Sequence, residues 1–483
     1  MAETGPSSRQ WRELRSDDSE RSTVESEDVE LEQAEASTLG RGAKRAQLAR
    51  APVRAPGRLR VAALGDVLPA LTAAGVSIAL GLYQLSQPSL WVDEAATFRA
   101  VSGSYGHLVS EHHWIYYTAL KPWTTIVGTS EFALRFPSVI AAGLACALLV
   151  PLGNRLLGPP IGSIAGIVLA VNPFVVQWSQ QARSYTIVVL VAILLTFAFL
   201  NLRENRTRRA WVIYSICLGL FVLIQPVSAG LVATAQFLAA PGFRARIAMA
   251  GMATLLATSI FLAGVYARDS AGGTLVWNEA PTVGRITHTM LELSGALGVG
   301  LGLALVGLAI TQRERLLLGC WAFAPLLISV VVTPVGHVFV DRYMIVSAPA
   351  LALLVALVVT RLGQALRATA ITAFAVGTVA GLVIWYSPDG SQNWPGEDWK
   401  AATRFAMAHG GAMTSSPSVA AAYRYYGGVE RNTGLFVIWS ASPRIFAGSW
   451  PVDVSFGDHL RVQWRGRAQP RHEGTKDRTA ARQ

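Results

Sequence analysis

Two adjacent acids, Asp93 and Glu94, lie in the stretch LWVDEAATFRA, a few residues after an apolar run long enough to cross a membrane. A carboxylate held partly out of water becomes a better proton acceptor and could deprotonate a substrate hydroxyl as a general base. The same two acids could instead begin a helix, where an Asp caps the first turn and both charges interact favourably with the helix dipole. The sequence leaves both interpretations open, so the surrounding elements have to be considered next.

The composition predicts a protein that crosses a membrane many times. Hydrophobic residues make up 52% of the 483 and charged residues only 15%, with a mean hydropathy of +0.38; this is too apolar for an ordinary soluble domain. The formal net charge of +11 comes from basic clusters between apolar runs, a pattern that argues against a nucleic-acid partner. The three cysteines lack the spacing of a disulfide framework or a zinc site.

About eleven apolar runs have roughly the length that crosses a bilayer. The two runs on either side of Gln225 are short for a complete span. The predicted spans are Ala63 to Leu85, Pro137 to Leu157, Ile161 to Trp178, Tyr185 to Leu202, Ala210 to Ile224, Val227 to Ala240, Ile247 to Tyr266, Ile286 to Ile310, Leu316 to Thr333, Tyr343 to Thr360 and Ala368 to Trp385.

Basic residues alternate between the loops, and this alternation predicts the topology. The arginine-rich loops share a side with the basic stretch before Val61, so this side and the N-terminus are expected to be cytoplasmic. An odd number of spans then places the C-terminal region outside the cytoplasm. The predicted organisation is a disordered tail over 1–60, a transmembrane domain over 61–386, an extracytoplasmic α/β domain over 387–465 and a disordered basic tail over 466–483.

The first outer loop, over 87–136, is too long to be a simple connection. Its pieces AATFRAV and HHWIYYTALKPWTTIV are amphipathic or apolar and rich in Trp and Tyr, which predicts helices lying at the membrane interface. Arg135 is expected to fix the start of the next span, with Pro137 in its first turn. Asp93 and Glu94 are therefore predicted to lie at the outer membrane surface.

Five motifs are similar, in this order, to those of the GT-C class of membrane glycosyltransferases: SLWVDEAATFRA, HHWIYYTALKPW, GTSEFALRFPS, QWSQQARSYTIVVL and FVDRYMIVSAPAL. The likeness runs from about Leu85 to Ala350 and is greatest to the protein O-mannosyltransferase and aminoarabinose-transferase branch, whose members use polyprenyl-phosphate sugars. The resemblance implies an all-α polytopic membrane fold with interfacial helices in the first outer loop. It says little about the sugar.

In such enzymes an Asp of the first outer loop is the catalytic base, a role that falls on Asp93 here, with Glu94 as its catalytic neighbour. The polyprenyl phosphate is itself the leaving group. The enzyme therefore has to deprotonate or orient an acceptor hydroxyl and neutralise charge that develops on the phosphate. The resemblance also implies inversion at the anomeric carbon in a single in-line displacement.

Cations at the same surface are the candidates for binding the donor phosphate. Arg183 in QARSY, together with Tyr185, is the first candidate, because a guanidinium makes bidentate contacts to phosphate oxygens. Lys121 and Arg342 are the second candidates. Arg183 could alternatively be a membrane-interface anchor that snorkels at a helix start.

His113 and Tyr117 in HHWIYY are the candidate substrate-binding residues. His112 and His113 stand where related transferases often have a His-Pro-Pro segment, and the two prolines are absent here, so the local loop shape is expected to differ. The alternative is that both are interfacial histidines hydrogen-bonded beside aromatic residues. No metal cofactor is expected, because the outer acids apart from the adjacent pair are scattered.

These features predict an inverting glycosyltransferase of a bacterial plasma membrane that moves a sugar, expected to be mannose, from a polyprenyl phosphate to a glycan, glycolipid or protein outside the cytoplasm. An arabinosyl or aminoarabinosyl donor is the alternative within the class. A lipid-linked-sugar transporter or flippase would need ionisable residues near mid-membrane, for which Glu292 is the main candidate. An inactive relative acting as a scaffold is a third alternative.

Overall fold

The computed structural model describes much of the chain between residues 64 and 464. Of its two compact units, Met1–Arg60 and Val61–Gln483, the first lies outside the described residues, as do His112 and the predicted tail over 466–483. The described residues are 64–108, 111, 113–240, 242, 244–246, 248–249, 252, 282–312, 314–332, 339–387, 398–408, 413–414, 417–428, 436–438, 444–447, 450–456 and 460–464.

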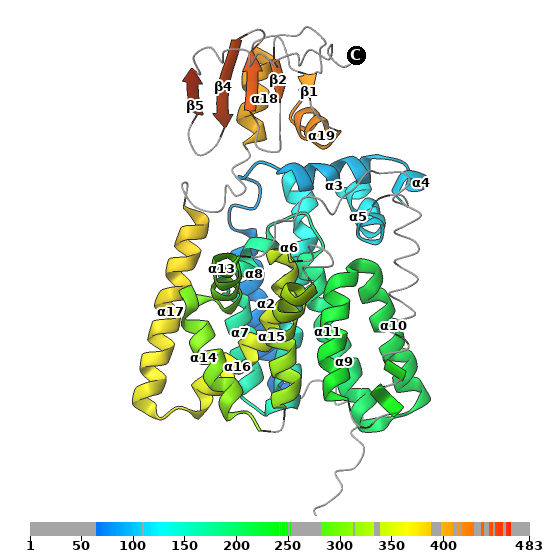
Figure 1. Ribbon diagram of the computed structural model, residues 1–483, viewed down its shortest axis with the longest axis vertical. Helices are drawn as coiled ribbons and strands as arrows, with labels where there is room; N and C mark the ends of the chain where they lie inside the picture. The colour runs from blue at the N-terminus through cyan, green and yellow to red at the C-terminus, as the bar shows by residue number, and fades with distance from the viewer. Residues whose placement is uncertain are drawn as a thin grey trace, which may run out of the picture. The chain divides into compact units, whose positions relative to one another are not determined.

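Five helical runs are long and apolar enough to cross a membrane, which confirms an all-α polytopic membrane fold (Figure 1). They are α2 (Leu64–Leu82), α6 (Glu131–Leu157), α9 (Tyr185–Asn205), η2 (Asp341–Ser347) continued by α16 (Ala348–Arg361), and α17 (Gln364–Tyr386).

Helix α6 begins earlier than the sequence predicts. Ser130 caps it by accepting a hydrogen bond from Ala133 N at 3.2 Å, and Glu131 adds a negative charge to the first turn. Pro137 therefore lies inside the helix, and the expectation that it begins the helix is wrong. The preceding polar residues, rather than the proline, determine where this helix starts.

The predicted span over 161–178 is broken. Helices α7 (Ile161–Ala170) and α8 (Pro173–Ser179) are bent by 59°. Between them the Asn172 side chain accepts hydrogen bonds from Phe174 N and Val175 N, and Pro173 occupies the first turn of α8. One capping side chain thus starts a new helix within an apolar run.

The predicted span over 286–310 is broken more sharply. Helix α13 (Val283–Ser294) is followed by η1 (Ala296–Gly298) and α14 (Val299–Ile310), and the pair is bent by 110°. Gly295 and Gly298 have φ of 74° and 92°, a region that glycine enters without steric cost. The prediction of one straight span is wrong because these glycines end one helix before the apolar run ends.

Three shorter helices follow further predicted runs: α10 (Arg208–Ile224), α11 (Pro226–Ala239) and α15 (Arg315–Val332). The predicted span over 247–266 lies mostly outside the described residues. The part of the chain that the structure describes has five helices that qualify as spans, or up to seven when each bent pair is one span. The number of eleven crossings stays a prediction.

The core of the bundle is formed by closely packed helices with small residues between them. Every residue of α16 from Ala348 to Val359 is buried, as expected of a helix that is apolar on all sides. A Cβ built on Gly162 would lie 2.0 Å from Val150 O, and one on Gly307 would lie 2.4 Å from Leu354 O. These glycines allow α7 to approach α6, and α14 to approach α16, backbone to backbone.

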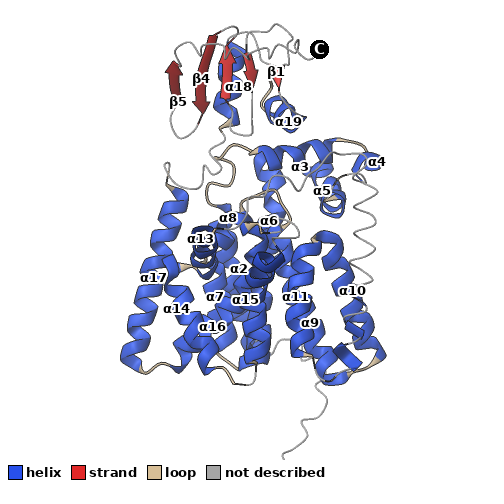
Figure 2. Cartoon of the chain, in the orientation of Figure 1, coloured by secondary structure: helices blue, strands red, loops and turns tan. Residues whose placement is uncertain are grey.

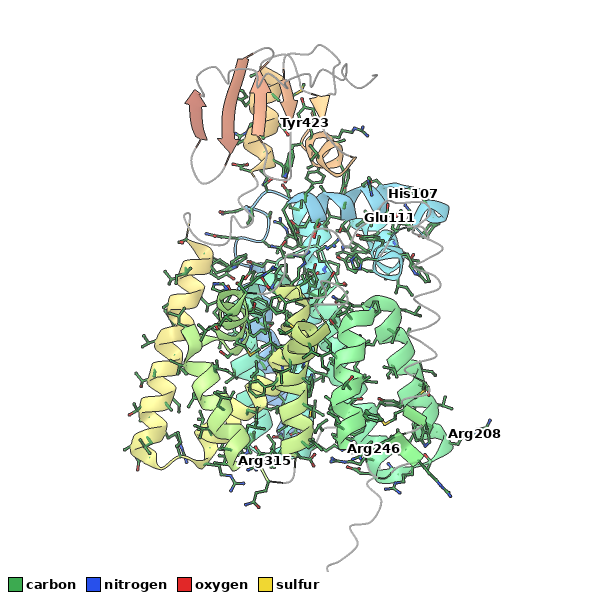
Figure 3. All side chains as sticks on the ribbon, in the orientation of Figure 1. His107, Glu111, Arg208, Arg246, Arg315 and Tyr423 are labelled. Carbon is green, nitrogen blue, oxygen red and sulfur yellow. The ribbon has the colours of Figure 1, made fainter. Side chains whose placement is uncertain are left out.

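The long loop contains three helices at one end of the bundle, α3 (Val92–Ser102), α4 (Tyr105–Leu108) and α5 (Trp114–Val127), and Figure 1 shows α3 lying across that end. Figure 3 shows His107 and Glu111 at this end and Arg208, Arg246 and Arg315 at the opposite one. Basic loops thus gather on one side of the bundle. Which side faces the cytoplasm remains a prediction.

The C-terminal region contains two helices, α18 (Trp399–Ala408) and α19 (Pro417–Tyr425), and a five-stranded sheet (Figure 2). The strands follow sequence order, with β1 parallel to β2 and the other neighbours antiparallel. They are β1 (Met413–Thr414), β2 (Phe436–Ile438), β3 (Arg444–Ala447), β4 (Trp450–Phe456) and β5 (Leu460–Trp464).

Candidate functional site

Asp93 is the second residue of α3, and its carboxylate lies beside two guanidinium groups. Arg183 Nη2 is 3.6 Å and Arg342 Nη2 is 3.7 Å from the same oxygen, Asp93 Oδ2. These separations are those of ion pairs that are too long for direct hydrogen bonds. The Asp93 side chain is 29% exposed, so it is accessible and at the same time close to two positive charges.

Arg183 belongs to the short turn between α8 and α9. Its Nη1 donates to Tyr117 Oη at 3.0 Å and to Asp93 O at 3.3 Å. Burial alone would lower the pKa of Arg183, but Tyr117, Asp93 and Tyr185 raise it well above its ordinary value. The side chain is only 10% exposed, so it is a permanent positive charge that is largely shielded from solvent.

The backbone around Arg183 is fixed by α3 and α6. Ser138 Oγ in α6 donates to Arg183 O at 3.0 Å. Thr97 Oγ1 in α3 lies 3.0 Å from Ala182 O and 3.2 Å from Asp93 O. The Thr97 hydroxyl thus lies between the segment that carries Asp93 and the segment that carries Arg183, and can donate to a carbonyl of either. The sequence analysis did not name Thr97, although its position one helical turn after Asp93 was a signal.

Arg342 approaches the site from η2. Its guanidinium lies 5.8 Å from the Trp91 ring centroid and 6.0 Å from that of Tyr343, within the range of cation–π attraction. Tyr185, at the start of α9, packs against Trp178 at 4.8 Å and Tyr343 at 6.3 Å between ring centroids. Trp91 and Tyr343 lie inside the quoted motifs SLWVDEAATFRA and FVDRYMIVSAPAL, but the sequence analysis did not single them out as site residues.

Glu94 has a different environment from its neighbour. Its carboxylate accepts hydrogen bonds from Arg135 Nε at 2.8 Å, Arg135 Nη2 at 2.6 Å and Ala182 N at 2.7 Å, with Trp91 N at 3.4 Å. Glu94 has no exposed surface, and the cavity beside it has a volume of only about 10 Å³, room for a single water. These contacts favour the helix-start interpretation of Glu94, and its predicted catalytic role stays an untested prediction.

Arg135 holds the chain that leads into α3, and not only the start of α6. Besides both oxygens of Glu94, it donates to the backbone carbonyls of Leu85 and Pro88 through Nη1 and of Ser89 through Nη2. All five N–H groups of the guanidinium are therefore used. This network fixes the chain immediately before Asp93.

Lys121 is not placed to bind a phosphate at Asp93. Its Nζ donates to Val101 O and Gly103 O, both at 2.6 Å, and lies 5.2 Å from the Tyr105 ring centroid. An ammonium at the last carbonyls of a helix stabilises the negative end of its dipole. The prediction for Lys121 is therefore corrected: it caps the C-terminus of α3.

Of the two predicted substrate-binding residues, Tyr117 lies in the cluster and His113 lies next to it. The Tyr117 hydroxyl contacts Arg183, and the His113 ring meets the Tyr117 ring edge-on at 6.2 Å between centroids. Burial is the main cause that raises the pKa of Tyr117, and Arg183 partly offsets it. The phenol is therefore neutral at ordinary pH.

Several other acids near this end also have ion-pair partners. Glu111 pairs with Arg99 at 3.1 Å, Asp341 with Arg285 at 3.1 Å, and Glu292 with His288 at 3.4 Å. Among the described residues, no group of three or more His, Cys, Asp or Glu side chains could hold a metal ion. Independence of a metal stays a prediction.

The architecture is shared with two solved structures. ArnT from Cupriavidus metallidurans in the apo state matches with a TM-score of 0.51 and 14% sequence identity, over 74% of this chain and 74% of that one. ArnT from the same organism bound to undecaprenyl phosphate matches with a TM-score of 0.50 and 14% identity, over 76% of this chain and 75% of that one. The comparison with curated proteins finds no match.

The chain therefore shares the fold of ArnT, in agreement with the GT-C resemblance read from the sequence. Residues 114–267, less than half of the chain, match the family model of dolichyl-phosphate-mannose-protein mannosyltransferases. The matched stretch includes Tyr117 and Arg183, and it ends before Arg342. Asp93 lies before the matched stretch, so only the geometry of the structure supports its inclusion in the candidate site.

Proposed function

We propose that this chain transfers a sugar from a polyprenyl phosphate to an acceptor hydroxyl with inversion at the anomeric carbon. The observation that carries the proposal is one partly exposed carboxylate, Asp93, beside two guanidinium groups, Arg183 and Arg342, in a GT-C fold. Transfer from a sugar phosphate needs a base for the acceptor and positive charge for the departing phosphate. These three residues would supply both.

The proposed reaction is a single displacement. The acceptor oxygen attacks the anomeric carbon from the face opposite the phosphate, and its proton passes to Asp93. The bond between the anomeric carbon and the phosphate oxygen breaks, and that electron pair leaves with the polyprenyl phosphate. Arg183 and Arg342 balance the charge that accumulates on the departing phosphate, while Tyr117 keeps Arg183 in place.

Mannose is the proposed sugar, supported by the description of the family that residues 114–267 match. A polyprenyl-phosphate carrier is supported by the similarly folded ArnT, which has been solved with undecaprenyl phosphate bound. We place the reaction at the extracytoplasmic face of a bacterial plasma membrane, with the N-terminus in the cytoplasm. The acceptor is a glycan, a glycolipid or a protein.

A transporter is less well supported. Transport of a charged lipid-linked sugar calls for ionisable residues along a path through the membrane. Asp93, Arg183 and Arg342 instead gather around one carboxylate oxygen at the bundle end that bears α3. Glu292 pairs with His288 one turn earlier on α13 and is 39% exposed, so it does not begin such a path.

The test is a transfer assay in membranes that contain the wild type or Asp93→Asn. Polyprenyl-phosphate mannose and polyprenyl-phosphate arabinose, each radiolabelled in the sugar, are supplied separately with endogenous acceptors. Labelling from mannose that disappears in Asp93→Asn supports the proposal. Labelling from arabinose alone would show that the donor sugar is arabinose and not mannose. Equal labelling by the wild type and Asp93→Asn would refute the role of Asp93.

A further inference from the structure

The segment between α2 and α3, residues 83–91, leads the chain to Asp93 and has no regular secondary structure of its own beyond turns. Gln84 within it has a positive φ of 56°. Backbone polar groups in such a segment need partners from elsewhere in the protein. Arg135 satisfies the carbonyls of Leu85, Pro88 and Ser89 from the side of α6.

The C-terminal helices supply the other partners of this segment. Lys400 Nζ in α18 donates to Ser86 O at 3.2 Å and to Gln87 O at 3.1 Å. Leu90 N donates to the hydroxyl of Tyr426, directly after α19, at 2.6 Å. Residues more than 300 positions away in the sequence thus bind backbone groups three to seven residues before Asp93.

Lys400 and Tyr426 are joined to each other and to α6. Lys400 Nζ lies 3.0 Å from Glu131 Oε1 and 5.9 Å from the Tyr426 ring centroid. The Tyr426 hydroxyl donates to the same oxygen, Glu131 Oε1, at 3.4 Å. Glu131 is the first residue of the helix that also carries Arg135, so both supports of segment 83–91 are fixed to α6.

Helix α19 also packs against α3 itself. Ala95, two residues after Asp93, is fully buried in a cluster with Trp399, Ala422 and Tyr423. Tyr425 meets Phe98 of α3 edge-on at 4.8 Å, and its hydroxyl donates to Thr129 O at 2.9 Å. The face of α3 opposite the bundle is therefore covered by residues of the C-terminal region.

We infer that Tyr426 and Lys400 are positioning residues, which hold segment 83–91 and the start of α3 so that Asp93 faces Arg183 and Arg342. This inference rests on the function proposed above. The C-terminal helices then help to position the proposed site and are not a structurally independent domain. The reason is geometric: displacement of a reacting group by about 1 Å can cost roughly 100-fold in rate.

The experiment compares Tyr426→Phe with Tyr423→Phe as a matched control. Both remove one phenolic hydroxyl at the end of α19, but the Tyr423 hydroxyl donates to Met407 Sδ of α18 at 3.4 Å, whereas the Tyr426 hydroxyl accepts from Leu90 N. The first measurement is hydrogen exchange of the Leu90 amide in the purified full chain. The second is the sugar-transfer rate, separated into kcat and the KM for the donor.

Tyr426→Phe should speed exchange of the Leu90 amide about fivefold, the effect of one lost hydrogen bond, and should lower kcat about tenfold with little change in donor KM. Tyr423→Phe should leave both unchanged. Unchanged exchange in Tyr426→Phe, or faster exchange with a normal kcat, overturns the inference. Absence of transfer by the wild type would count against the proposed function, whereas the exchange result decides the anchoring of segment 83–91 independently.

Discussion

Asp93 and Glu94 are neighbours in the chain, but their carboxylates have opposite surroundings. Glu94 is fully buried and bound by the Arg135 guanidinium and the Ala182 amide at 2.6–2.8 Å. Asp93 is 29% exposed, with its cations at 3.6 and 3.7 Å. Consecutive helical residues point about 100° apart, so the first turn of α3 gives one acid to the interior and one to the site. Adjacent acids need not act as a pair.

The largest expected effect is on stability, through the buried ion pair of Glu94 with Arg135. Arg135→Met should lower the free energy of unfolding by about 3–5 kcal/mol, because it leaves the Glu94 charge buried and unpaired. Thermal unfolding of the purified protein in detergent measures this loss. The double variant Glu94→Leu with Arg135→Leu should recover part of it. A single variant as stable as the wild type would show that Glu94 does not depend on its partner.

A smaller effect is expected on donor binding, through the two arginines beside the partly exposed Asp93. Arg183→Gln and Arg342→Gln should each weaken binding of undecaprenyl phosphate about 10- to 100-fold, the worth of hydrogen bonds to a charged group. Titration of the purified protein with that lipid measures the change. Arg285→Gln is the matched control, because Arg285 pairs with Asp341 beside Arg342. Equal losses in all three variants would contradict a specific phosphate site.

The smallest effect is expected for the hydroxyl behind Arg183. Tyr117→Phe should raise the donor KM about threefold, since one neutral acceptor is lost. Burial raises the pKa of Tyr117. The contribution of the neutral phenol to the folding free energy is therefore fully present below about pH 10, and it is lost as the pH rises through the raised pKa. Transfer rates between about pH 6 and 9 should therefore change in level but not in profile. A shifted profile would show that this phenol titrates in the reaction.

The residues of the proposed site were easier to predict from the sequence than the residues that hold them in place. Asp93, Arg183 and Arg342 stand in three motifs far apart in the chain, and the structure brings their side chains together, as the resemblance to GT-C enzymes predicts. Hydropathy likewise found the runs that became α2, α6, α9, α16 and α17, because an apolar run of this length has few other uses.

The supporting contacts could not be predicted because they depend on tertiary partners. Lys121 looked like a free cation, but the crossing of α3 and α5 places it on two backbone carbonyls. The sequence predicts Glu94 as a second catalytic acid, but in the fold its carboxylate is buried against Arg135. The breaks at Asn172 and Gly295 depend on single residues that average hydropathy does not register.

The most direct test compares Asp93→Asn and Glu94→Gln in the same preparation, measuring sugar transfer and thermal unfolding for both. Asp93→Asn should lose roughly 10²- to 10⁴-fold in transfer and unfold at the temperature of the wild type. Glu94→Gln should unfold at a lower temperature and keep measurable transfer where it is still folded. Near-normal transfer by Asp93→Asn, or a fully stable and inactive Glu94→Gln, would contradict the division of roles between the two acids.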